Sequence, residues 1–146
     1  MKKKHLHLVR TLNRVFLATT AHQKGGELIS EQDVILTGLQ MRRPGLAFFS
    51  GSQIDESLSD DEPIPSFVVE VISPTDDIVK VEEKVAEYFK AGVAVVWHIF
   101  PENQVVYVYT SRKNVVICTD EDVCSAAPAL PDFEIMANDL FSLPNF

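Results

Sequence analysis

The chain of 146 residues is 46% hydrophobic and 23% charged, which is typical of one globular domain and excludes a disordered or fibrous protein. Its two cysteines, Cys118 and Cys124, are too few for a disulfide framework, and their spacing matches no zinc motif. The longest apolar stretch, residues 91–97, is far shorter than the ~20 residues of a transmembrane helix. We therefore expect a single domain over residues 1–146 that does not enter a membrane.

The net charge of −8 is unevenly distributed along the chain. Residues 1–43 carry 8 basic and 3 acidic side chains, whereas residues 44–146 carry 5 basic and 18 acidic ones. The amino-terminal end can therefore approach a polyanion, although a solvated helix face predicts the same pattern. The chain begins like a signal peptide, but Arg10 and Arg14 interrupt the apolar run that should follow. We expect a cytoplasmic protein.

The first expected element is a helix from about residue 4 to residue 21. Apolar residues recur at spacings of three and four, as on a helix that packs on a core: Leu6, Val9, Leu12 and Phe16. The opposite face carries a basic ridge: Lys3, His7, Arg10 and Arg14, supported by Lys2 and Lys4. This ridge predicts weak, salt-sensitive and sequence-independent contact with DNA. The alternative is that these side chains only solubilise an outer helix face.

Strand signals follow the first helix. Two β-like runs occupy residues 27–36 and 46–50. Residues 51–65 contain five acidic side chains and two prolines without periodicity, which predicts a surface loop. Residues 67–72 are rich in β-branched side chains and predict a short buried strand.

A second helix is expected next, with Thr75 as its N-cap and Gly92 at its carboxyl end. Its apolar stripe consists of Ile78, Val81, Val85, Tyr88 and Phe89. Three further strands form an antiparallel meander, at residues 94–100, 104–110 and 114–118. The tail supplies a strand-like segment and one helical turn capped by Asn138.

This order of elements is helix, three strands, helix and strand, followed by two added strands. It predicts an α/β fold of the α+β kind, with a mixed sheet flanked by helices and extended by the meander.

Glu70 and Lys84 are the candidates for chemistry. Glu70 lies inside an apolar strand, where an ionised carboxylate must be paired or bound to a cation, or else become protonated. The alternative is an edge-strand glutamate that points into water. Lys84 lies beside Tyr88 at the border of the helix's apolar stripe, so it can lean toward the sheet and neutralise charge on a phosphate. The alternative is a lysine whose stem covers apolar surface while its ammonium reaches water.

A resemblance to a known family is carried by four blocks: RRPGLAFFS, FVVEVISPTD, EEKVAEYFKAGVAVVWHIFPE and LPDFEI, with DLF near the end. Together they resemble the Uma-type putative restriction endonuclease family, which belongs to the PD-(D/E)XK nuclease superfamily. The resemblance runs from about residue 41 to residue 143. It implies a restriction-endonuclease-like αβββαβ core, in agreement with the order of elements.

The resemblance also implies a DNA endonuclease that uses Mg²⁺ or Mn²⁺. It implies that Glu70 binds the metal and that Lys84 replaces the lysine expected at Ile72. The chain departs from the family pattern at Gly45, which stands where a metal-binding Asp is expected, and at Phe100, where an Asp commonly precedes the proline. The family's usual amino-terminal segment is also expected to be missing.

Two hypotheses of different classes follow. The first is a metal-dependent endonuclease with Glu70 as metal ligand and catalytic residue, Lys84 as catalytic electrostatic stabiliser, and DNA contacts from the basic ridge. One carboxylate alone is a weak Mg²⁺ site, so catalysis can be lost while the fold persists. The second hypothesis is a non-catalytic nuclease-fold module that forms a homodimer or binds a partner through strands within residues 104–118, where Tyr107 and Tyr109 alternate with valines.

Overall fold

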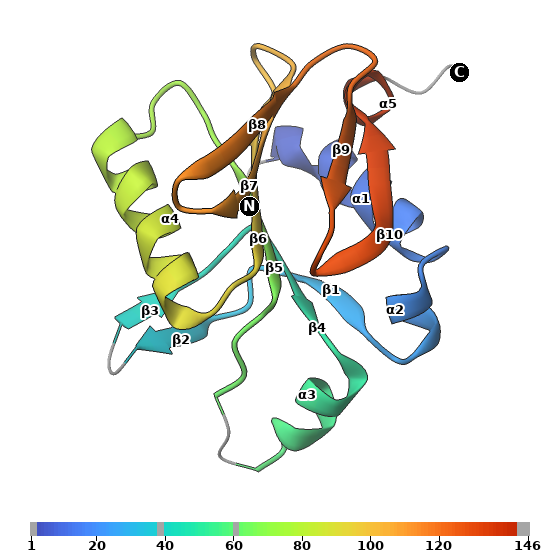
Figure 1. Ribbon diagram of the computed structural model, residues 1–146, viewed down its shortest axis with the longest axis vertical. Coiled ribbons are helices and arrows are strands. Elements are labelled where there is room, and N and C mark those ends of the chain that lie inside the picture. The colour runs from blue at the N-terminus through green and yellow to red at the C-terminus, as the bar shows by residue number, and fades with distance from the viewer. Residues whose placement is uncertain (1–2, 38–39, 60–61, 143–146) are drawn as a thin grey trace.

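A six-stranded mixed sheet organises the computed structural model, which describes residues 3–37, 40–59 and 62–142 (Figure 1). In spatial order its strands are β1 (Glu27–Ser30), β4 (Leu46–Phe49), β5 (Phe67–Val71), β6 (Val95–Phe100), β7 (Val105–Ser111) and β8 (Asn114–Cys118). Only β5 and β6 are parallel, and every other neighbouring pair is antiparallel. The mixed sheet and the meander β6–β7–β8 confirm the predicted fold class.

Different elements cover the two faces of the sheet (Figure 1). One face carries the 3-10 turn Lys3–His5, α1 (Leu6–Phe16), the hairpin of β9 (Val123–Ala126) and β10 (Leu130–Met136), and α5 (Ala137–Phe141). The other face carries α4 (Ile78–Ala91) and the hairpin of β2 (Val34–Thr37) and β3 (Gln40–Arg42). Apolar cores fill both layers, around Trp97 and Phe133 on the α1 face and around Tyr88 on the α4 face. This two-sided burial is why β5 and β6 are apolar at nearly every position.

The helix α4 forms the crossover between the parallel strands β5 and β6. It begins at Ile78, where the side chain of Asp77 accepts a hydrogen bond from the backbone N–H of Val79. The expected N-cap at Thr75 is therefore wrong, because Asp76 accepts from the N–H of Ser73 and closes a separate turn first. The expected end is confirmed, since Gly92 adopts a left-handed φ of 108°.

The amino-terminal half is more broken than its sequence pattern predicts. The first helix ends at Phe16, and α2 (Thr20–Gln23) starts again after Thr19, whose side chain accepts from the N–H of His22. Leu8 rather than Leu6 is buried, so the buried stripe of α1 is rotated from the expected one. The expected strand at 27–36 is two strands in separate sheets, because the chain turns at Glu31 with a φ of 52°.

Three smaller features also differ from what the sequence predicts. The acidic segment 51–65 contains α3 (Gly51–Glu56), whose amino end is closed by a capping box of Ser50 and Gln53. Strand β9 was not expected from the sequence. Asn138 does not cap α5, which begins directly after β10 with Met136 at the N-cap position and no side-chain cap.

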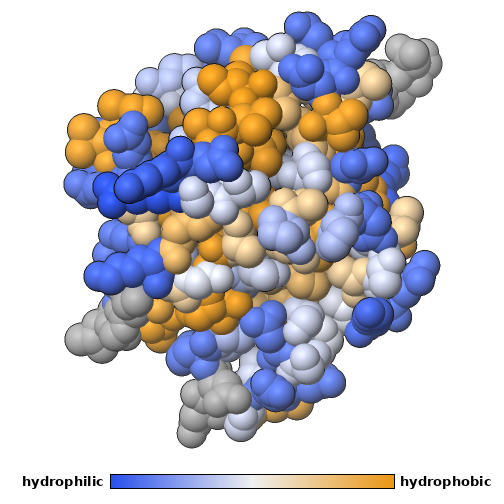
Figure 2. All heavy atoms as spheres, viewed as in Figure 1, coloured by the Kyte–Doolittle hydropathy of each residue, from blue (hydrophilic) through white to orange (hydrophobic). Residues whose placement is uncertain are grey.

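The surface retains exposed apolar side chains (Figure 2). They gather where Figure 1 places β8 and the first turn of α4, and include Ile78, Val79, Val115, Val116 and Ile117. None of the helices that the described residues form is long and apolar enough to cross a membrane.

Candidate functional site

Glu70 lies in the interior of the central sheet. Strand β5 has β4 on one side and β6 on the other, and Glu70 is only 8% exposed. The alternative of an edge-strand glutamate in water is therefore wrong. Its register partner on β6 is His98, which is 3% exposed. An ionised carboxylate at this depth requires specific partners.

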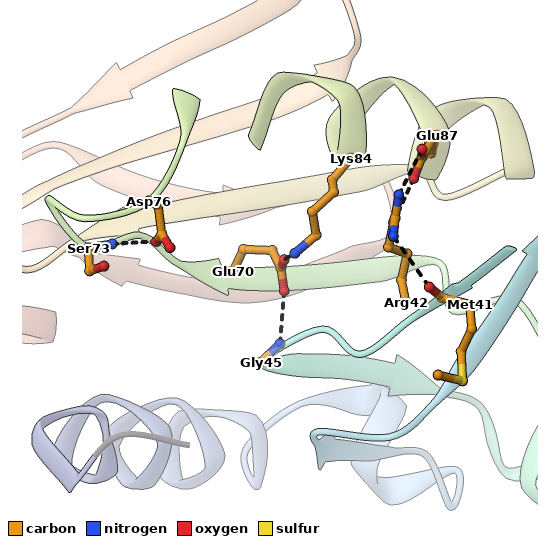
Figure 3. Close-up of polar contacts among 8 residues, drawn as sticks. All are labelled: Met41, Arg42, Gly45, Glu70, Ser73, Asp76, Lys84 and Glu87. Carbon is orange, nitrogen blue, oxygen red and sulfur yellow. Dashed lines mark hydrogen bonds and ion pairs between the residues drawn. The ribbon is translucent and has the colours of Figure 1, made fainter. Parts of the chain in front are cut away.

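Both carboxylate oxygens of Glu70 have such partners (Figure 3). Lys84 reaches from α4 and places its Nζ 2.6 Å from Oε2. The backbone N–H of Gly45 donates to Oε1 from the opposite side, with an N···O distance of 2.9 Å. The prediction that Lys84 leans toward the sheet is confirmed, whereas its alternative role as a lysine that only covers apolar surface is wrong.

Gly45 brings its backbone close to β5 at the position where the resemblance expects a metal-binding Asp. A Cβ atom at this position would lie 3.2 Å from the carbonyl oxygen of Val69, which is a tight contact. With no side chain, Gly45 supplies an N–H donor to Glu70 and no carboxylate. At the position where a second acidic ligand is expected, Gly45 instead stabilises the Glu70 carboxylate by a hydrogen bond.

The described residues do not fit a resident Mg²⁺ or Mn²⁺ ion. These ions require several hard oxygen ligands in near-octahedral geometry. No group of three or more His, Cys, Asp or Glu side chains among the described residues could hold a metal. Asp76 and Asp77 line the same pocket as Glu70 but do not form such a group with it, and an ammonium and an amide already satisfy both oxygens of Glu70.

Two pockets meet at Glu70. The pocket on the α4 side is lined by Asp76, Asp77, Lys80, Lys84 and His98, among others. The pocket on the α1 side is lined by residues that include His5, Glu31, Arg43 and Gly45. Ile72, where the superfamily lysine is expected, lines the α4-side pocket and contributes no charge to it. Glu70 and Lys84 are therefore reachable from outside the protein even though their ion pair is largely enclosed.

Buried titratable groups next to the ion pair remain neutral. Burial and the positive charge of Lys84 lower the pKa of His98 to about 4. Burial, followed by the nearby charge of Glu70, raises the pKa of Tyr88 far above its usual value. At neutral pH the ion pair therefore has an uncharged imidazole and an uncharged phenol as neighbours.

A second ion pair attaches the β2–β3 hairpin to α4. Arg42 donates from Nε to Oε2 of Glu87 at 2.6 Å and from Nη2 to Oε1 at 2.9 Å (Figure 3). Gln40 donates to the same Oε1 at 2.6 Å. Sequence reasoning missed this contact. No spacing rule connects two residues so far apart in the chain. The charged residues near position 42 and on α4 were the only sequence signal for this ion pair.

The basic ridge lies on the far side of α1 from Glu70. Lys3, Arg10 and Arg14 are exposed, whereas the inner face of α1 lines the pocket beside Gly45 and Glu70. The half-buried side chain of His7 has polar partners. Its Nε2 lies 2.9 Å from the carbonyl oxygen of Ser142, and its Nδ1 lies 3.4 Å from Nη2 of Arg10. Lys2 lies outside the described residues. The structure therefore does not place the ridge and the ion pair on one surface.

The strand order and the helices on both faces of the sheet define a protein of the mixed α/β class. A solved structure described as a putative nuclease belonging to DUF820 from Anabaena variabilis ATCC 29413 is similar, with a TM-score of 0.81 and 20% sequence identity over 97% of this chain and 82% of that chain. At this identity the likeness shows the fold. A comparison with curated proteins finds no match. The family model Uma2, described as putative restriction endonuclease, matches residues 1–139, and the chain belongs to that family.

Proposed function

We propose that this chain is a non-catalytic member of the restriction endonuclease family, in which the Glu70–Lys84 pair stabilises the fold instead of supporting hydrolysis. One observation carries the proposal: Lys84 and the N–H of Gly45 together satisfy both oxygens of Glu70 where a metal would need them. A metal would have to displace the ammonium, and no group of three or more His, Cys, Asp or Glu side chains among the described residues could hold it there, which makes a poor Mg²⁺ site.

A second candidate is the metal-dependent endonuclease that the family resemblance implies. The position of Lys84 favours it, because its ammonium borders a pocket in which a phosphate could contact it. In this candidate Glu70 binds Mg²⁺ or Mn²⁺ and Lys84 neutralises charge on the phosphate. The absence of a second acidic side chain at position 45 counts against it.

Plasmid cleavage separates the two candidates. Purified wild-type protein is incubated with supercoiled DNA and Mg²⁺ or Mn²⁺, beside Glu70→Gln and Lys84→Met variants prepared in the same way. We expect nicking by the wild type to be no greater than by either variant. Metal-dependent nicking by the wild type that both substitutions remove would establish the endonuclease.

We also propose weak, sequence-independent contact with DNA through Lys3, Arg10 and Arg14. Arg10 and Arg14 are exposed on α1 and Lys3 is exposed in the turn before it, which supports the proposal, because phosphates attract such a cluster without any reading of bases. DNA bound there would lie away from Glu70, which agrees with binding without cleavage. A cytoplasmic location stays a prediction.

A further inference from the structure

Strand β8 is an open edge of the central sheet with apolar residues at its centre. Val115, Val116 and Ile117 are 41%, 57% and 55% exposed, and β8 pairs only with β7 in its sheet among the described residues. Natural edge strands are usually protected by charges, proline or a bulge within the strand. β8 carries no charged residue from Asn114 to Cys118. Its outward backbone groups can therefore accept another strand.

The register of β8 with β7 shows which side chains on each face of the sheet an added strand would pack beside. Ile117 lies opposite Tyr107 and Val115 lies opposite Tyr109, on the face that also carries Glu70 and α4. Val116 lies opposite Val108 on the other face. Both faces of the edge are thus apolar, and a strand added here would bury side chains on each of them.

Charges flank this apolar centre with opposite signs at its two ends. Arg112 and Lys113 precede β8, Asp120 and Glu121 follow it, and all four side chains are exposed. Val116 is the midpoint of the three exposed apolar residues and lies equally far along the chain from Arg112 and Asp120. Arg112 and Asp120 lie in the turns before and after β8. A second antiparallel β8 centred on Val116 would bring the basic turn of each copy toward the acidic turn of the other at both ends, whereas a parallel copy would bring like charges together.

We propose that two copies of this chain pair through antiparallel β8 strands about a twofold axis at Val116. The sheet then continues across both copies, and the same surface is used on each, as a twofold interface requires. An antiparallel copy of β8 supplies opposite charges near both ends of the edge and apolar side chains at its centre, which favours a second copy as the occupant. The proposal goes beyond the loss of hydrolysis and does not depend on it.

Sedimentation equilibrium of the full chain over a wide concentration range tests the assembly. We expect a reversible dimer for the wild type. Two charge variants test its geometry: an acidic variant, Arg112→Glu with Lys113→Glu, and a basic variant, Asp120→Asn with Glu121→Lys. Asparagine is used at position 120 because the backbone there has a φ of 55°, which asparagine tolerates. Circular dichroism checks that both variants remain folded.

Each charge variant alone should dimerise at least tenfold more weakly than the wild type, since like charges then meet at both ends of the interface. A mixture of the two should form a mixed dimer, because opposite charges meet again. A wild type that stays monomeric at every concentration would overturn the proposal, as would dimerisation that neither variant weakens. Weakening in both variants without recovery in the mixture would also overturn it.

Cysteine cross-linking tests the register independently. Val116→Cys places two thiols at the twofold axis, so mild oxidation should give a covalent dimer. Lys113→Cys is the matched control, since its two copies would lie well apart on either side of the axis. Native Cys118 and Cys124 are buried and should contribute no cross-link in the wild type. Equal cross-linking of the two variants would exclude the antiparallel register about Val116.

Discussion

Lys84 on α4 and Glu70 on β5 form an ion pair of 2.6 Å that joins a helix to the middle of the sheet beneath it. Glu70 is the more deeply buried partner, since its side chain is 10% exposed whereas that of Lys84 is 34% exposed. The two partners therefore respond differently to loss of the other. Glu70 cannot return to water without opening the sheet, whereas Lys84 needs only to change rotamer.

This asymmetry predicts the outcome of a double-mutant cycle. Lys84→Met should lower the free energy of unfolding by about 1–3 kcal/mol, because it leaves a buried carboxylate with one hydrogen bond. Glu70→Gln should cost less, since the amide oxygen still accepts from Gly45 and the lysine reaches solvent. The double variant should be more stable than the sum of the two losses predicts. Chemical denaturation measures all four proteins, and additive losses would show that the pair is not coupled.

Metal removal should leave the protein unchanged. If no resident ion binds at Glu70, neither EDTA nor millimolar Mg²⁺ or Mn²⁺ should shift the thermal midpoint, because only a ligand that binds the native state raises it. The control is Glu70→Gln, which should respond identically. Stabilisation by Mn²⁺ in the wild type but not in Glu70→Gln would reveal a metal site at this residue and contradict the proposed function.

Acid should destabilise the fold through His98. Its folded pKa of about 4 lies below the ~6.5 of an unfolded histidine, so protons bind the unfolded state preferentially. The contribution of neutral His98 to the free energy of unfolding is fully present above about pH 6.5 and is lost as pH falls toward 4. It amounts to about 3 kcal/mol at most. Unfolding curves across this window should be flatter for His98→Gln than for the wild type, and parallel curves would show that His98 titrates normally.

The basic ridge predicts a defined salt dependence of DNA binding. Three contacts from Lys3, Arg10 and Arg14 give a slope of about −3 in log K against log salt, at ~0.9 per phosphate. Arg10→Gln with Arg14→Gln should reduce the magnitude of the slope by about 2. Changing the exposed Lys24 and Lys90 to glutamine removes the same charge elsewhere and is the matched control. Filter binding over a salt series measures the slopes, and equal effects of the two pairs would mean that the ridge is not the contact surface.

The Arg42–Glu87 pair should stabilise the β2–β3 hairpin locally as well as the fold as a whole. Glu87→Gln should weaken the attachment of the β2–β3 hairpin to α4 by about 1–2 kcal/mol, because it removes the charge from hydrogen bonds that are only partly exposed. Hydrogen exchange should then speed up in β2 and β3 more than in β5. Asp33→Asn, which alters the exposed pair with Arg43, should change exchange little. Uniform acceleration across the protein would show that the hairpin does not open independently.

Local sequence pattern was enough to predict those elements whose signals are continuous along the chain. The three meander strands, α4 with its terminal Gly92 and the buried strand around Glu70 are examples, because alternation, helical spacing and a glycine C-cap act between near neighbours. The same pattern singled out Glu70, since a carboxylate in an apolar strand needs a partner wherever that partner lies. It also placed Lys84 on the correct side of its helix. The sequence did not predict that the expected first helix and first strand are each divided in two, because the breaks after Phe16 and at Glu31 contain no proline.

Tertiary structure alone decided what these residues can do together. The sequence determined a mixed α/β protein with a buried acid and a basic amino-terminal helix face, since each property depends on residues close together in the chain. Whether Glu70 faces a metal or an ammonium depended on β4 bringing Gly45 to one oxygen and α4 bringing Lys84 to the other. The position of β8 at the sheet edge likewise depended on strand order, which no local pattern encodes. Contacts between distant segments arise only when the whole chain packs, and in this protein such contacts define both the site and the exposed edge.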